Sequence, residues 1–297
     1  MFKIVTDSAW DRPIEMANEL GVTVVPFYVS FDDKNYLKEH VDIGVDEFYK
    51  TMVETRCFAK TSLPSIQDYV DTFKPMAEEG YDILCYTISK KLSGSFNSAN
   101  IASQIVMDEY PDRNIKVFDS TLVTLSQGDW IIMAANMALN GSTMEEIINV
   151  QDLCLPTSRI FFSVDNLDYL IHGGRVGKAM GKSANLLGLK PIIVVKDGEL
   201  FSEGVVRGKK ASYRKCIDKL IEYIKETTNS PSSYVFSATS AYDVEDRNIL
   251  KEMLKEALRE NWPDFEEEIS TCQIGCTIGV HTGPTAFGVS AIRKVSD

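Results

Sequence analysis

A strand, a loop and a helix meet at residues 87–99 (TISKKLSGSFNSA). The preceding residues 81–86 (YDILCY) have the length and the β-branched and aromatic content of a buried strand. Ser93, Gly94 and Ser95 then stand where the helix should begin. A helix N-terminus offers unpaired N–H groups and a partial positive charge, so an anion could bind here. The alternative is that Ser93 or Ser95 only caps the helix.

Small polar residues stand at four places that follow predicted strands, namely residues 6–8, 61–62, 93–95 and 119–120. The carboxyl ends of parallel strands share one edge of a sheet, so we expect these groups to converge on one rim. Hydroxyls, a glycine and carboxylates, with little positive charge, suit a single carboxylate better than a phosphate-rich nucleotide. Residues 61–65 (TSLPS) are expected to form a loop, with Ser65 opening the next helix.

Two other segments are rich in glycine. Residues 172–183 (HGGRVGKAMGKS) fail the P-loop pattern, because the two later glycines are separated by three residues, not four, and no strand leads directly into the segment. Arg175 is expected near an acidic group or a ligand. Residues 279–288 (GVHTGPTAFG) are expected to form a loop in which His281 is a general base, a hydrogen-bond donor to a ligand, or a structural residue.

A serine hydrolase is the alternative from a different class. Ser93 would be the nucleophile, His281 the base and Asp7 the residue that orients the base. Ser93 does not lie in a G-x-S-x-G elbow, however. Cys276 with His281 is a second pair by proximity only, and a phosphocarrier that uses His281 has only fold analogy behind it.

Composition limits the possible partners. The chain has 297 residues and a net charge of −12, which argues against binding to nucleic acid or anionic membranes. No apolar run approaches the ~18 residues of a membrane span, and the first residues do not form a signal peptide, so we expect a cytoplasmic protein. The six cysteines are expected to be free thiols. Cys272 and Cys276 lack a partner pair at zinc-finger spacing, and no metal or cofactor is expected.

The pattern of elements predicts two domains in an α/β protein. Strands and helices alternate in the first half, which indicates a parallel sheet covered on both faces. After residues 155–158 (LPTS) the pattern changes, and Asp197 with Gly198 is a hairpin signal. We predict a Rossmann-like α/β domain over residues 1–156 and an α+β domain over residues 157–297.

These motifs together resemble the DegV family, the bacterial fatty-acid-binding proteins that serve as lipid-carrier subunits of fatty acid kinase. The similarity covers the whole chain in order. The matching pieces are 6–8 (TDS) with Asp11, 61–65 (TSLPS), 92–99 (LSGSFNSA), 119–120 (DS), 173–175 (GGR), 190–191 (KP) and 281–284 (HTGP).

The resemblance implies a long-chain fatty acid, such as palmitate, stearate or oleate, in a tunnel between the two domains. Its carboxylate would be held by Thr61 and Ser93, with the Gly94 N–H and His281 in the same network. The chain would have no catalysis of its own, and a partner kinase would phosphorylate the carboxylate to an acyl phosphate. A head group held by hydroxyls, without a salt bridge, would stay accessible to that kinase.

The candidate docking charges for the kinase are Arg175, Arg207, Lys209 and Lys210. Two departures from the family pattern stand out. Lys90 and Lys91 replace small residues before Leu92 and could bring a cation near the carboxylate, and Thr285 takes the last position of a motif that commonly reads G-P-G.

Overall fold

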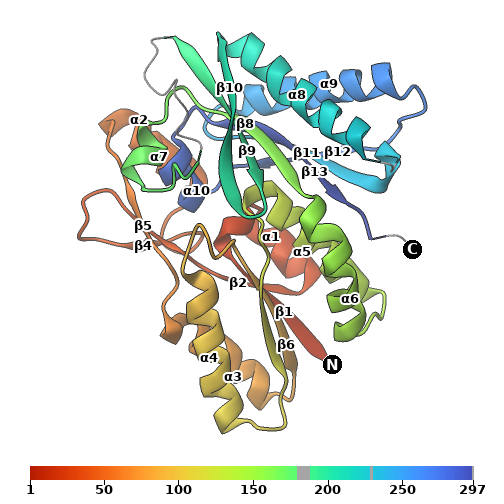
Figure 1. Cartoon of the computed structure of the whole chain (residues 1–297). Coiled ribbons are helices and arrows are strands. Elements are labelled where there is room, and N and C mark those ends of the chain that lie inside the picture. Colours follow the sequence, from red (N-terminus) through yellow and green to blue (C-terminus); the bar gives the residue numbers. More distant parts are fainter. Residues whose placement is uncertain (179–187, 228–229, 296–297) are drawn as a thin grey trace.

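The computed structural model describes residues 1–178, 188–227 and 230–295, which form three β-sheets and the helices around them (Figure 1). In chain order the elements are β1 (Phe2–Asp7), η1 (Ser8–Trp10), α1 (Ile14–Leu20), β2 (Val22–Val25), β3 (Tyr28–Ser30), β4 (Leu37–Lys38), α2 (Val45–Thr55), β5 (Lys60–Ser62), α3 (Ile66–Glu78), β6 (Asp82–Thr87), α4 (Ser95–Glu109), β7 (Ile115–Asp119), α5 (Thr124–Leu139), α6 (Met144–Cys154), η2 (Leu155–Thr157), β8 (Arg159–Ser163), α7 (Asp168–His172), β9 (Leu189–Lys196), β10 (Glu199–Arg207), α8 (Lys209–Glu226), η3 (Pro231–Ser233), β11 (Tyr234–Ser240), α9 (Val244–Asn261), β12 (Ile269–Gln273), α10 (Cys276–Thr282) and β13 (Phe287–Arg293).

The first sheet is parallel, as the alternation of strands and helices predicts. Its strand order is β2-β1-β6-β7, and every neighbouring pair runs parallel. Side chains alternate along each strand, so Ile4 and Leu84 pack towards α5 and α6 while Val5 and Ile83 pack towards α3 and α4. Both faces are therefore covered, which explains why the strands read as continuous apolar runs.

The second sheet is mixed, with the order β10-β9-β8-β13-β11-β12, and only β11 and β12 pair in parallel. Helices α8 and α9 cover one face. The predicted hairpin at Asp197 and Gly198 joins β9 to β10, and both residues have positive φ (53° and 76°), as this kind of tight turn requires. From the sequence we expect a helix over about residues 209–228; α8 ends at Glu226, and residue 228 lies outside the described residues.

A third, three-stranded sheet (β4-β3-β5) corrects one expectation. The apolar run at residues 22–31 divides into β2 and β3 at Pro26, which cannot donate a ladder hydrogen bond, and β3 pairs with β4 and β5. Thr61 and Ser62 therefore lie on β5, with Thr61 opposite Val29, and not in a loop after a parallel strand. The predicted cap at Ser65 is confirmed, because it forms a reciprocal capping box with Asp68.

The predicted loop around His281 is wrong at its start, since residues Cys276–Thr282 form α10 and place His281 in the last turn of a helix. The N–H groups of Cys276 and Thr277 donate to the buried Glu39 carboxylate over 2.5 and 3.3 Å. This long-range cap stabilises a helix whose glycine content disfavours it. Gly279 is needed there because a Cβ would collide with the Tyr49 ring.

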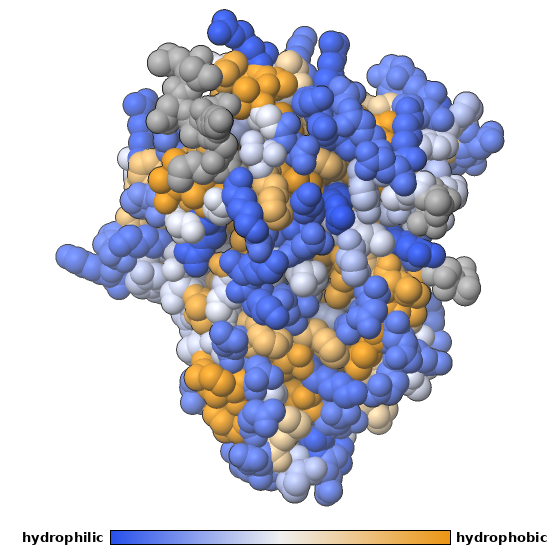
Figure 2. All heavy atoms as spheres, in the orientation of Figure 1, coloured by the Kyte–Doolittle hydropathy of each residue, from blue (hydrophilic) through white to orange (hydrophobic). Residues whose placement is uncertain are grey.

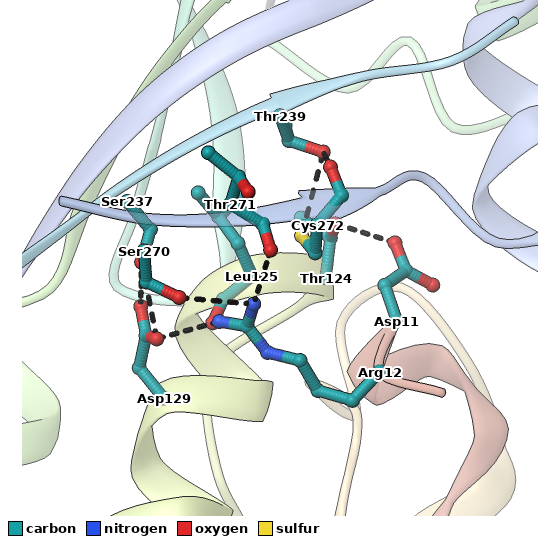
Figure 3. Close-up of polar contacts among 10 residues, drawn as sticks. All are labelled: Asp11, Arg12, Thr124, Leu125, Asp129, Ser237, Thr239, Ser270, Thr271 and Cys272. Carbon is teal, nitrogen blue, oxygen red and sulfur yellow. Dashed lines mark hydrogen bonds and ion pairs between the residues drawn. The ribbon is translucent and has the colours of Figure 1, made fainter. Parts of the chain in front are cut away.

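A buried ionic contact ties the first half of the chain to the mixed sheet (Figure 3). Arg12 lies 2.5 Å from Asp129 of α5, and both side chains are almost wholly shielded from water. The Ser237 hydroxyl on β11 donates to Asp129, and Arg12 also donates to Ser270 on β12. The predicted domain boundary between residues 156 and 157 falls in η2 and stays a prediction.

All six cysteines are free. None of the helices in the described ranges is both long enough and apolar enough to cross a membrane. The glycine-rich segment 172–183 is described only as far as residue 178, and the remainder of that motif lies outside the described residues.

Candidate functional site

A cavity of about 240 Å³ lies between the small sheet, the loop before α4, helix α10 and the mixed sheet. Most of its lining is apolar and comes from both halves of the chain. These side chains include Phe27, Ile88, Ile160, Phe162, Val195 and Ile278. The cavity has the character of a site for an apolar chain, because apolar walls with a few placed polar groups are typical of small-molecule sites.

Polar residues gather at one part of the lining. Thr61 from β5, Ser93 from the loop before α4, Arg175 from the segment after α7 and His281 from α10 all contribute to it. The Thr61 hydroxyl and His281 Nε2 lie 3.0 Å apart and share a hydrogen bond. The structure thus brings together four of the residues that the sequence singled out.

His281 is held in its neutral form. Burial, with a smaller effect from the Arg175 charge, lowers the pKa of its imidazole to about 4. Nδ1 is buried and makes no hydrogen bond to the described residues. The ring packs directly on Gly173, where a Cβ would collide with it. At neutral pH His281 can therefore offer a fixed hydrogen-bonding edge without a full charge.

The loop that carries Ser93 is fixed from below. The Asp7 carboxylate accepts hydrogen bonds from the Ile88 N–H (2.9 Å), the Ser95 hydroxyl (2.8 Å) and Gln127 (2.9 Å). Burial raises the pKa of Asp7 to about 6, although these hydrogen bonds lower it in part. Asp7 is thus a structural support of the loop and not a group at the cavity.

Three of the four predicted strand ends, at residues 6–8, 93–95 and 119–120, meet at this loop. Asp7 binds the Ile88 N–H, and Asp119 accepts from the Lys90 N–H over 3.1 Å. Thr61 reaches the same place from a different sheet, because β5 pairs with β3. The expected convergence is correct for the parallel sheet, but the reason given for Thr61 is wrong.

Ser93 and Gly94 take different positions. The Ser93 hydroxyl accepts from the Ser95 N–H over 3.2 Å and also lines the cavity, so it both supports the helix start and faces a ligand. Gly94 lines an adjoining outer groove instead, and its Cα packs beside Leu63. The two interpretations of Ser93, cap and ligand group, are therefore compatible.

Arg175 brings a positive charge to the site. It lines both the cavity and the outer groove, beside the hydroxyls that are expected to hold the head group. Its Nε donates to the Leu92 carbonyl (3.1 Å) and its Nη1 to the Gly173 carbonyl (2.7 Å). The expected position near a ligand follows from the preceding glycines, but its link to Leu92 had no local signal.

Three threonines at the cavity were missed altogether. The hydroxyls of Thr124, Thr277 and Thr239 donate respectively to Asp11 (2.5 Å), Glu39 (2.7 Å) and the Cys272 carbonyl (2.9 Å). Protein acceptors therefore engage all three hydroxyl protons. No motif marks these residues, since each comes from a different element.

Within the described residues, Ser93, His281 and Asp7 do not form the catalytic triad that the hydrolase alternative requires. His281 Nε2 is bonded to Thr61, Ser93 accepts from a backbone N–H, and Asp7 serves the loop. Cys276 begins α10 beside Glu39, and burial raises the pKa of its thiol far above the usual range. Nor does any cluster of three or more metal-ligating side chains occur in the part of the chain that the structure describes.

The two candidate docking arginines occupy separate hollows. Arg175 lies at the groove beside the hairpin tip, whereas Arg207 lines another hollow together with Lys209 and Lys210. Arg207 is at the far end of β10 from the tip at Glu199, roughly 25 Å along the strand. These arginines do not form one continuous patch.

Comparisons with known proteins identify the family. A family model described as "Uncharacterised protein, DegV family" matches residues 1–294. A DegV domain-containing protein of Clostridium acetobutylicum is 33% identical over 292 residues, which cover 98% of each chain.

Solved structures agree with this match over the full length. A crystal structure described as a fatty acid (stearic acid)-binding protein from Eubacterium ventriosum is 36% identical, with a TM-score of 0.93 and coverage of 99% of both chains. A structure titled for fatty acid binding of a DegV family protein from Thermus thermophilus is 27% identical, with a TM-score of 0.84 and coverage of 98% of this chain and 99% of that one.

Proposed function

Since this chain belongs to the DegV family, we propose that it binds a long-chain fatty acid such as stearate, palmitate or oleate. The tail occupies the apolar cavity, and Thr61 and Ser93 hold the carboxylate, assisted by His281 and the Gly94 N–H. The observation that carries the proposal is the uneven polarity of the cavity, whose polar residues 61, 93, 175 and 281 adjoin a mainly apolar lining. The hydroxyls of the lining threonines 124, 239 and 277 donate to protein acceptors.

The energetics of such binding come mainly from the tail. Each methylene removed from water contributes about 0.8 kcal/mol, so a long chain supplies most of the affinity. The head group needs hydrogen bonds that replace water without a large desolvation cost. Hydroxyl groups and a neutral imidazole meet this need, and Arg175 adds a cation that already bonds two backbone carbonyls.

We further propose that the bound carboxylate is presented to a fatty acid kinase, which converts it to an acyl phosphate. This chain then acts as a carrier without catalysis of its own, because His281, the base of the hydrolase alternative, bonds Thr61 and Asp7 supports the loop. Arg175 and Arg207 are the proposed docking charges. Because they lie in separate hollows, a partner that used both would cover much of this face.

The first experiment is native mass spectrometry of the purified protein, followed by organic extraction and lipid analysis. A near-stoichiometric fatty acid is the expected result. The double variant Thr61→Ala/Ser93→Ala should then weaken fatty acid binding at least about tenfold, since hydrogen bonds to a charged group are worth roughly 1.5–3 kcal/mol each. Titration with a fluorescent fatty acid measures this change.

The matched control is Thr55→Ala/Ser142→Ala, which removes two hydroxyls away from the cavity. It should bind as the wild type does. A protein that stays empty after incubation with a panel of fatty acids would overturn the carrier proposal. Unchanged affinity in the Thr61 and Ser93 variant would overturn only the head-group assignment.

A further inference from the structure

A second hollow opens directly outside the cavity. This outer groove, about 590 Å³ in volume, shares Leu92, Ser93, Arg175 and Leu200 with the cavity lining, so the two hollows adjoin at these residues. It lies on the outer side of Ser93, next to the expected position of the carboxylate. The groove is therefore placed to contact whatever is added to the head group.

The groove is strongly cationic in a chain whose net charge is −12. Its lining holds four cationic side chains and one carboxylate, from Lys90, Lys91, Arg175, Lys178 and Glu199. Figure 2 shows hydrophilic residues gathered over the centre of this face, where Figure 1 places the tip of the β9–β10 hairpin beside the start of α4. The excess of positive charge in this groove is therefore opposite in sign to the net charge of the chain.

The lysines are held in place rather than scattered. Glu199 at the hairpin tip binds Lys91 through Oε1 (2.8 Å) and Lys178 through Oε2 (2.6 Å). Both contacts, Lys178 first, hold the pKa of Glu199 at about 2, so it is ionised throughout the physiological range. Lys91 also donates to the Asp197 carbonyl over 3.0 Å. One carboxylate thus positions two ammonium groups and leaves an excess of positive charge.

Lys90 is less committed. It lies 3.6 Å from Asp119, and its side chain is 58% exposed, so it can turn to a ligand. Three glycines of the groove (94, 174 and 177) leave room for a bulky tetrahedral group. A free carboxylate that is already bound at the mouth does not need this many cations, but a dianionic group does.

We propose that the outer groove is a phosphoryl subsite, in which Lys90 and Lys91 bind the phosphate of an acyl phosphate whose acyl chain fills the cavity. This inference rests on the proposed carrier function and adds a product-retaining role to it. The protein then favours the phosphorylated ligand over the free acid and shields the mixed anhydride until it is passed on.

The test uses stearate and 2-oxononadecylphosphonate, a stable analogue of stearoyl phosphate in which a methylene replaces the bridging oxygen. Isothermal titration compares both ligands on the full-length protein. Lys90→Ala/Lys91→Ala should weaken phosphonate binding about tenfold, or about 1.4 kcal/mol, and leave stearate within about twofold. The difference in phosphonate affinity between the wild type and this variant should decrease with added salt, because exposed charges are screened.

The matched control is Lys210→Ala/Lys215→Ala, which removes the same charge from the separate hollow at the start of α8. It should leave both ligands unchanged. Glu199→Gln should tighten phosphonate binding, since it removes the competing carboxylate. If both lysine pairs weaken the phosphonate equally, or neither does, the subsite is wrong while stearate binding stands. If the wild type binds neither ligand, the carrier proposal itself fails.

Discussion

The polar groups at the two ends of helix α10 differ in how fully they are hydrogen-bonded. At its N-terminal end, the Glu39 carboxylate is fully buried and accepts four hydrogen bonds, two from backbone N–H groups and two from the hydroxyls of Ser8 and Thr277. At its C-terminal end, His281 has one bonded nitrogen and one without a partner among the described residues. The two ends are one short helix apart; Glu39 is fully shielded from water, and His281 is partly shielded.

This difference distinguishes residues that stabilise the fold from residues that can bind a ligand. A polar network whose members bind one another is rigid and has little capacity left for a ligand. The one protein partner of the His281 ring is the Thr61 hydroxyl, which lines the cavity, whereas its unbonded Nδ1 packs against Gly173. Glu39 therefore fixes the helix, and His281 at the other end takes its position from that support.

The largest expected effect lies on the supporting side. Asp129→Ala leaves Arg12 buried without its partner, so the free energy of unfolding should fall by about 3–5 kcal/mol. Urea denaturation monitored by circular dichroism measures it. Arg12→Met/Asp129→Leu, which replaces the pair with apolar side chains, should recover most of the loss. A loss below about 1 kcal/mol in the single variant would show that the pair is not a support.

A smaller effect is expected in the pH dependence of stability. The pKa of His281 is about 4 when folded and 6.5 in its ordinary state. Between these values the unfolded chain binds more protons, so this group makes stability rise with pH from about 4 to 6.5 and adds no slope above that. The shift corresponds to at most about 3 kcal/mol.

Asp7 acts in the other direction, since its folded pKa of about 6 lies above its ordinary 3.8 and stability falls as pH rises between them. The two slopes therefore oppose each other in the wild type. His281→Gln should remove the rising contribution, so its unfolding free energy should gain relative to wild type towards pH 4. His172→Gln is the control for an exposed histidine. Parallel curves for wild type and His281→Gln would contradict the assignment.

The smallest effect concerns the contact behind His281. Gly173 has ordinary helical φ, so an alanine is strained there only by the His281 ring. Gly173→Ala should shift the ring, because overpacking displaces neighbouring side chains, and weaken fatty acid binding about tenfold, or about 1.4 kcal/mol. Gly44→Ala, where a Cβ meets nothing within 4 Å, is the matched control. Wild-type affinity in Gly173→Ala would mean that the ring position is unimportant.

Local signals in the sequence were enough for most of the fold. The capping boxes at Ser65 and Thr143 and the hairpin at Asp197 and Gly198 depend on residues within a few positions of each other. Alternation of apolar strands and helices likewise predicts the parallel sheet, because burial on both faces requires it. The motifs around Thr61, Ser93 and His281 also identified residues that prove to share one cavity.

Only the tertiary structure decided how these residues meet. Thr61 is on a strand because it pairs with β3, and His281 is on a helix because Glu39, more than two hundred residues away in the chain, caps its start. Arg175 enters the cavity lining through a bond to the Leu92 carbonyl. Each of these contacts joins distant segments, and their free energy exists only once the two halves pack, so no local pattern records it.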